Sequence, residues 1–124
     1  NGGVASIQQM AEHLALVDGV MIGRAAYENP YLLAEVDQRF FGTSQPIPTR
    51  HDIVHRLLPY VEQQLQAGTP LHCMTRHILG LFQGVPGARA WRRSLSENTH
   101  HANAGVEVLT TALRLVPEAL AVGA

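Results

Sequence analysis

The stretch VDGVMIGRAA, residues 17–26, decides how the N-terminal part of this sequence is interpreted. Residues 19–22 are short and continuously apolar, which is typical of a strand that is buried on both faces of a parallel sheet. The stretch then reaches Gly23 and Arg24, a flexible backbone position followed by a permanent cation. The pattern therefore predicts a buried strand that presents an arginine at its end.

The residues before this stretch predict a helix over about 6–17. Ser6 and Gln9 have the spacing of a capping box, and apolar residues then recur at helical spacing at Ile7, Met10, Ala11, Leu14 and Val17. The chain begins with Asn1-Gly2-Gly3, a turn that we expect to follow a strand. A turn, a helix and a buried strand make half of a repeating β/α unit. We therefore expect an α/β fold over 1–42, formed by the last β/α units of a TIM barrel and entered from inside that domain.

The rest of the chain predicts a separate all-α helical bundle over 49–124. Residues 43–48 form a linker by composition, because Pro46 and Pro48 favour extended backbone. Thr49 and Asp52 resemble a second capping box, which would start a helix that stops at Gly68. Three further helices are predicted, from residue 70 to about 82, from 88 to 98, and from 106 to about 120. Four amphipathic helices of this length are typical of a bundle.

The composition limits the class of protein. The chain has 124 residues, of which 46% are hydrophobic and 15% charged, values of a globular domain rather than a disordered one. Neither a membrane-spanning apolar run nor a signal peptide is evident, so we expect a cytoplasmic protein without a membrane partner. A single cysteine excludes an internal disulfide and fits a reducing compartment. All nine basic residues are arginine, which indicates either a GC-rich genome or the recognition of phosphate by guanidinium groups.

Two glycine-bearing loops suggest a binding site for phosphate. In (β/α)8 barrels, phosphate commonly binds between the loops that follow the last two strands. Gly2-Gly3 and Gly23-Arg24 would both follow strands, one β/α unit apart, so both loops would open on the same rim. Glycines let backbone N–H groups approach the phosphate oxygens, and Arg24 would add a charge-assisted hydrogen bond. The alternative is an ordinary turn followed by an arginine in a surface ion pair.

The stretch GARAWRRSLSE, residues 87–97, is the most basic part of the chain. Arg89, Arg92 and Arg93 fall on one stripe of the predicted helix, because side chains three or four residues apart are neighbours. Trp91 and Leu95 mark the opposite stripe, which we expect to face the core. The arginines could form a solvated face partly neutralised by Glu97, or they could contact an RNA backbone; the residues alone leave both readings open.

The seven histidines and Cys73 do not form a predicted metal site. Cys73 and His77 are one helical turn apart and His72 is adjacent, but no second cluster completes the four ligands of a zinc site. Cys73 is interpreted as a small buried thiol.

The motifs NGG and VDGVMIGRAAYENPYLL, followed by TRHILGLFQGVPGARAWRRSLSE, resemble the C-terminal part of the tRNA-dihydrouridine synthases, A subfamily. The resemblance extends from residue 1 to about 97. It implies a flavoenzyme that uses FMN and NADPH to reduce the C5–C6 double bond of D-loop uridines, at positions 20 and 20a of tRNA. It also implies a flavin-binding barrel followed by a helical tRNA-binding domain, in a monomer whose partner is tRNA and not DNA.

The resemblance assigns roles to individual residues. Positions that match the motif holding the FMN phosphate are Asn1, Gly2, Gly3, Gly23 and Arg24. Positions that match tRNA contacts are Arg89 and Arg92, joined by Arg93, with Arg76 and His77 as further candidates. Cys73 does not match the proton-donating cysteine of the family, so we predict no catalytic residue in this chain and no activity of the chain by itself. Two alternatives are an RNA-binding helical module without catalysis and another oxidoreductase with an FMN-phosphate-binding barrel.

Overall fold

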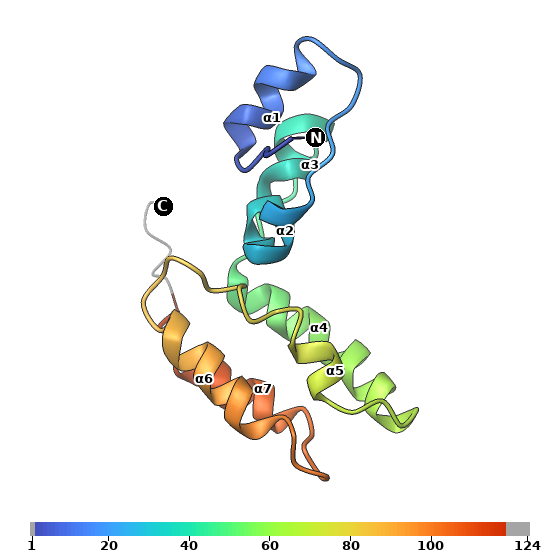
Figure 1. The fold of residues 1–124 in the computed structure, drawn as a ribbon, viewed down its shortest axis with the longest axis vertical. Coiled ribbons are helices and arrows are strands. Elements are labelled where there is room, and N and C mark those ends of the chain that lie inside the picture. Colours follow the sequence, from blue (N-terminus) through green and yellow to red (C-terminus); the bar gives the residue numbers. More distant parts are fainter. Residues whose placement is uncertain (1, 119–124) are drawn as a thin grey trace. The chain divides into compact units, whose positions relative to one another are not determined.

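The structure is a computed structural model that describes residues 2–118. The chain divides into two compact units, Asn1–Pro48 and Thr49–Ala124 (Figure 1). The described residues form helices, turns and irregular segments, and none of them is in a β-strand. The predicted α/β TIM-barrel fragment over 1–42 is therefore wrong.

The predicted strand over 19–22 is an irregular segment. An extended segment becomes a strand only when it exchanges backbone hydrogen bonds with a neighbouring extended segment. Within the part of the chain that is described, no such partner lies beside 19–22. Met21 is 53% exposed, where the strand prediction required burial, and Val17, which was predicted on the apolar side of the preceding helix, is 54% exposed. The apolar run 19–22 therefore had the composition of a buried strand, but the described residues include no second extended segment that pairs with it and covers it.

Unit 1 contains short helices. They are α1 (Ile7–Leu14), α2 (Arg24–Glu28), the 3₁₀-helix η1 (Pro30–Glu35) and α3 (Val36–Phe41). The predicted cap at Ser6 is confirmed, because its hydroxyl accepts the N–H of Gln9 at 3.1 Å. The Gln9 side chain accepts the N–H of Ala5 at 2.7 Å, one residue earlier than a capping box requires. The helix ends at Leu14, about three residues before its predicted end.

The end of unit 1 is held by a tyrosine. The Tyr31 hydroxyl, on η1, donates to the carbonyl of Pro48 at 2.8 Å. This hydrogen bond connects Pro48, the last residue of segment 43–48, to η1 of the same unit. Of the apolar side chains described in unit 1, Val4 and Met10 are buried.

Unit 2 contains the longer helices. They are α4 (Arg50–Gln66), α5 (His72–Thr75), α6 (Ala88–Asn98) and α7 (Glu107–Arg114). The capping box at the start of α4 is confirmed: Thr49 accepts the N–H of Asp52 at 3.0 Å, and Asp52 accepts that of Thr49 at 3.1 Å. The predicted helix over 88–98 is confirmed as α6. The predicted fourth helix is α7, and the part of that prediction beyond residue 118 lies outside the described residues.

The predicted helix over 70–82 is wrong. Only the four residues of α5 are helical, and residues 76–87 form a series of turns. Three glycines and a proline lie between residues 80 and 87, and Gly84 and Gly87 adopt positive φ angles of 84° and 91°. Glycines in this conformation keep residues 84–87 out of a helix, whereas α5 ends at Thr75 with no glycine at its C-terminus. The apolar side chains at helical spacing are instead buried from a turn, with Leu81 and Phe82 at 2% and 1% exposure.

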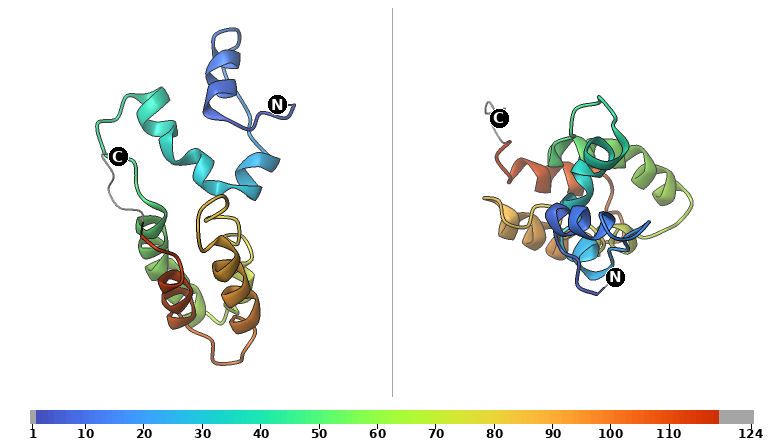
Figure 2. Two further views of the ribbon diagram at one scale, coloured as in Figure 1. Left: turned by 90° about the vertical axis from the view of Figure 1, so that its left-hand side faces the viewer. Right: turned by 90° about the horizontal axis from the view of Figure 1, so that it is seen from above.

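The core of unit 2 is built around Trp91 on α6. Trp91 is fully buried, donates its indole N–H to the carbonyl of Ile78 at 3.0 Å, and packs edge-on against Phe82. The Arg50 guanidinium donates to the carbonyl of Leu81 at 2.9 Å, so both α4 and α6 hold the turn segment 76–87. Helix α7 packs against α6 and α4 (Figure 2). The buried apolar residues of the unit are Val54, Val61, Leu71, Leu81, Phe82, Trp91, Leu95, Leu109, Ala112, Leu113 and Val116.

Candidate functional site

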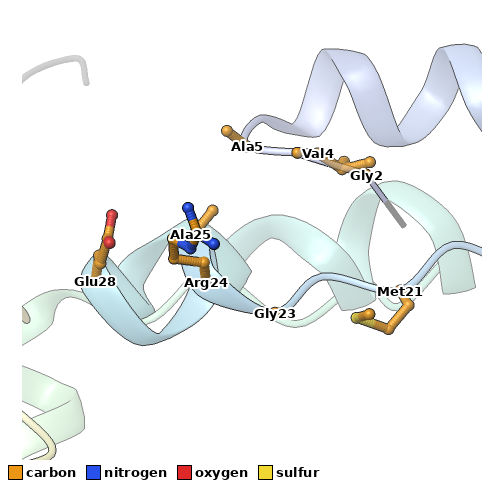
Figure 3. Close-up of a pocket in the computed structure, with 9 residues that line it drawn as sticks. Gly2, Val4, Ala5, Met21, Gly23, Arg24, Ala25 and Glu28 are labelled. Carbon is orange, nitrogen blue, oxygen red and sulfur yellow. The ribbon is translucent and has the colours of Figure 1, made fainter.

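A pocket of about 460 Å³ lies within unit 1 (Figure 3). The segment 2–5 forms one side, and the other side consists of Met21 together with α2 and its N-cap. The structure thus brings Gly2, Gly3, Gly23 and Arg24 to one pocket, although they come from segments about twenty residues apart. The remaining predicted residue of this set, Asn1, lies outside the described residues.

The two N-terminal glycines give this pocket a bare backbone wall. Gly2 and Gly3 each have φ of +85°, a conformation that side chains of L-residues rarely adopt. A Cβ atom built at either position would meet no atom within 4 Å. Glycine is therefore required here by backbone conformation and not by lack of space. The open space beside this backbone can admit a ligand.

Arg24 supplies the positive charge of the pocket. It is the first residue of α2, with Gly23 as the N-cap, whereas the sequence predicted a loop that follows a strand. Its side chain is exposed, and Figure 3 shows it extending from α2 toward the segment that carries Val4 and Ala5. Within residues 2–118 the Arg24 guanidinium forms no ion pair. A cation that is exposed and uncompensated at a concave site can bind an anion.

Glu28 also lines the pocket, and sequence reasoning missed it. It lies one helical turn after Arg24 on α2, and Figure 3 shows both side chains on the same side of that helix. The i, i+4 spacing was the signal that could have found it. Its carboxylate opposes the binding of an anion, although solvent screens this effect at an exposed site.

The arginine stripe of α6 lies in unit 2. Trp91 and Leu95 are fully buried, as predicted, while Arg89, Arg92 and Arg93 are exposed. The anchoring of Trp91 to Ile78 and Phe82 fixes the rotation of α6 within its unit, so the arginines face outward. An exposed cluster of positive charges on a rigid helix can hold phosphate groups of a nucleic-acid backbone.

Three of the predicted RNA contacts already have partners within the protein. The Arg93 guanidinium donates to Glu97 at 2.8 Å, and this hydrogen bond raises the pKa of Arg93 above its ordinary value. The Arg76 guanidinium donates to Nε2 of His77 at 3.2 Å. Among residues 2–118 the guanidinium groups of Arg89 and Arg92 form no such contact, so these two are the most available of the predicted RNA contacts.

Cys73 is partly exposed, whereas the sequence predicted a buried thiol. Among residues 2–118, no three His, Cys, Asp or Glu side chains come together as a metal site would require. No helix in this range has both the length and the apolar character needed to cross a membrane.

Residues 1–117 match the family model described as dihydrouridine synthase (Dus). The chain is 56% identical over 117 residues to the tRNA-dihydrouridine(20/20a) synthase of Vibrio cholerae serotype O1, which covers 94% of this chain and 36% of that protein. It is 57% identical over 120 residues to the enzyme of the same name from Vibrio vulnificus, covering 97% of this chain and 37% of that protein. The enzyme of the same name from Escherichia coli K12 is 51% identical over 118 residues, covering 95% and 34%. The chain thus spans about a third of the length of these curated relatives.

Proposed function

This chain belongs to the dihydrouridine synthase family, and we propose that it contributes the FMN-phosphate site and the tRNA-holding surface to the reduction of uridine to dihydrouridine in tRNA. The uridines would be those of the D-loop at positions 20 and 20a, the two numbers that the names of the relatives carry for those proteins. The protein would act as a monomer in the cytoplasm, with tRNA as its partner. The observation that carries the proposal is the single pocket shared by Gly2, Gly3, Gly23 and Arg24.

The pocket of unit 1 fits the phosphate of FMN. Gly2 and Gly3 offer backbone that is not covered by side chains, and the Arg24 guanidinium lines the same space. Backbone N–H groups and a guanidinium are the donors that phosphate oxygens require. Asn1 joins this set by its place in the motif. When bound, a flavin reduced by NADPH supplies the hydride for the C5–C6 double bond of uracil, while the residues of this chain anchor and orient it through its phosphate.

The arginine stripe of α6 fits the substrate. Arg89 and Arg92 are exposed on a helix whose opposite face is buried, so their positions are fixed by the core of unit 2. Such contacts position a nucleic acid without reading its sequence. Chemistry on a base requires that the base leaves its stack, and this surface would hold the tRNA while the target uridine is extended. Arg93, bound to Glu97, would take a smaller part.

Flavin retention and activity test the first half of the proposal. A chimaeric protein is made in which this chain replaces the matching segment of the Vibrio cholerae relative, and its flavin content and its NADPH-dependent formation of dihydrouridine in unmodified tRNA are measured. Arg24→Ala should lower flavin retention about tenfold or more, because a charge-assisted phosphate contact is lost. Arg39→Ala removes an exposed arginine outside the pocket and serves as the matched control. Equal flavin content in both variants would contradict the assignment of the pocket.

Binding of tRNA tests the second half. Arg89→Ala and Arg92→Ala should each weaken tRNA binding and reduce the slope of log affinity against log salt by about 1. Arg56→Ala, an exposed arginine on α4, removes the same charge at another place and should have a smaller effect. Unchanged tRNA binding in both α6 variants would mean that the arginine stripe is a solvated face that does not contact tRNA. Retained tRNA binding with no dihydrouridine formed by the chimaera would favour an RNA-binding module without catalysis.

A further inference from the structure

A second pocket, of about 660 Å³, lies within unit 2, away from the arginine stripe in the chain. It is enclosed by the turn that follows α4 and by the loop 99–105 that follows α6. The titratable side chains that line it are all histidines: His72, His100 and His101. The proposed function uses none of these residues.

Two of the histidines are stacked. The rings of His72 and His100 lie with their centroids 4.6 Å apart and their planes at 25°. Imidazole is the side chain whose charge changes between pH 5 and 8. When both rings carry a proton, two positive charges lie side by side, and that arrangement requires a nearby anion for stability. In any stacked pair of imidazoles, protonation and the presence of a neighbouring anion therefore favour each other.

The rest of the lining suits an anion. Among the described residues no carboxylate lines the pocket, while Thr69 and Asn103 add polar side chains and Gly68 adds bare backbone. The titratable and charged groups nearest to the lining segments in the chain are Glu62 on α4, Cys73 on α5, Arg76 directly after α5, Glu97 on α6 and Glu107 on α7. Glu97 binds Arg93, away from the pocket. The Glu107 carboxylate accepts the N–H of the lining residue Gly105 at 3.1 Å, so it lies at the edge of the pocket and opposes an anion there.

We propose that the pocket bounded by His72, His100 and His101 binds one phosphate group together with protons. The group is either a phosphate of the tRNA backbone or free phosphate. The pocket follows the C-terminal end of α6, and Arg89 lies near its N-terminal end, so about 15 Å of helix separates the two. A backbone phosphate held here would extend the tRNA contact along the whole length of α6. The assignment of the phosphate to the tRNA backbone rests on the proposed function, whereas the phosphate site itself does not.

Inorganic phosphate tests the site directly. The 124-residue chain is titrated with phosphate while the ring resonances of its histidines are followed by NMR, at pH 6 and at pH 8. We expect saturable shifts at His72 and His100, with an affinity about tenfold higher at pH 6, since protonated imidazole is the form that binds an anion. His100→Gln should abolish both the shift at His72 and its pH dependence, and because His100 is exposed, this variant should fold. His13→Gln, in α1 of unit 1, is the matched control.

The outcomes test separately whether the phosphate site exists and whether the bound phosphate comes from tRNA or from solution. The absence of a saturable shift at pH 6, or an equal response in His100→Gln, overturns the proposal. If phosphate binds, unmodified tRNA is the second probe: a loss of tRNA affinity in His100→Gln at pH 6 assigns the site to the tRNA backbone, and unchanged tRNA affinity assigns it to free phosphate. If Arg89→Ala and Arg92→Ala both fail to weaken tRNA binding while phosphate still binds at His100, the tRNA-holding part of the proposed function fails and the phosphate site stands.

Discussion

The two units of this chain bury their apolar side chains very differently. In unit 1, Val4 and Met10 are the buried apolar residues among those described, whereas eleven such residues form the core of unit 2. Large apolar side chains that are exposed lie mainly in unit 1: Leu14, Leu16, Val17, Met21, Tyr27, Leu33, Phe41 and Ile47. Unit 2 exposes Tyr60 and Leu115. Unit 2 therefore carries its own hydrophobic core, and unit 1 has helices without one.

This difference shows that the helices of unit 1 are stabilised mainly by local interactions, whereas those of unit 2 are also stabilised by tertiary packing. Helices of unit 1 depend on caps and turns, such as the Ser6 cap of α1 and the left-handed Gly42 that ends α3. Caps and propensities leave short helices marginal in water, because most helical stability in proteins comes from tertiary packing. The pocket assigned to FMN phosphate thus lies in the less stabilised unit, and the arginine stripe lies in the more stabilised one.

Hydrogen exchange should give the largest contrast. Backbone amides of α4, α6 and α7 should exchange about a thousandfold more slowly than those of α1, α2 and α3, because opening unit 2 exposes a core and opening unit 1 does not. The measurement is exchange followed by mass spectrometry on the 124-residue chain. Uniform protection across residues 2–118 would contradict the difference in core formation.

Trp91→Ala should have the largest effect of a single substitution. The change removes a fully buried indole together with its hydrogen bond to Ile78 and its contact with Phe82. We expect a loss of about 3–5 kcal/mol in the free energy of unfolding of unit 2, measured by urea denaturation with circular dichroism. Tyr60→Ala, at a side chain that is 51% exposed, is the control and should cost less than about 0.5 kcal/mol. Equal losses would mean that the burial of Trp91 does not stabilise this unit.

Gly87→Ala should have the next largest effect, a loss of about 2–4 kcal/mol in the free energy of unfolding of unit 2, measured by urea denaturation. Gly87 has φ of +91°, and a Cβ there would lie 2.9 Å from the carbonyl oxygen of Leu115. Gly84 has a similar φ of +84° but open space around it, so Gly84→Ala isolates the conformational cost, about 1–2 kcal/mol. The difference between the two variants measures the close contact between the start of α6 and the end of α7. Equal losses would show that this contact relaxes without cost.

Local features of the fold could be predicted from the sequence, and long-range ones could not. The caps at Ser6 and Thr49 and the helix over 88–98 depend on residues within one or two turns, and the structure confirms them. The strand over 19–22 failed because it needed a hydrogen-bonding neighbour that a local pattern cannot supply. The helix over 70–82 failed because the segment after Thr75 forms turns whose carbonyls at Ile78 and Leu81 are bonded by Trp91 and Arg50, distant partners that apolar spacing cannot reveal.

The proximity of four residues of the candidate site could be predicted, although the fold that brings them together could not. The sequence placed Gly2, Gly3, Gly23 and Arg24 at one site, and the structure gathers them at one pocket without the barrel from which their proximity was inferred. The prediction omitted Glu28, which lies one helical turn after Arg24, because the motif used for the prediction included only glycines, Asn1 and a cation. The stacking of His72 on His100 was also beyond reach, because these residues lie 28 positions apart and only the packing of unit 2 brings their rings together.

The smallest expected effect concerns the start of α4 and its dependence on pH. Hydrogen bonds from the Thr49 backbone and side chain lower the pKa of Asp52 below its ordinary value. A carboxylate whose pKa is lower in the folded state stabilises the fold above its unfolded pKa, about 3.9, and this contribution disappears as the pH falls through the folded value. Unit 2 should therefore lose stability as the pH decreases below about 4.

Asp52→Asn should flatten that decline, because the variant has no carboxylate to protonate at the cap. Thr49→Ser keeps a hydroxyl that can accept the N–H of Asp52, so it is the matched control and should keep the acid-dependent loss. Urea unfolding of both variants between pH 3 and pH 6 makes the test. Parallel curves for Asp52→Asn and the unsubstituted chain would mean that the capping box, although formed, adds no pH-dependent stability. The better-packed unit would then depend on its core alone, and the contrast with unit 1 would rest entirely on burial.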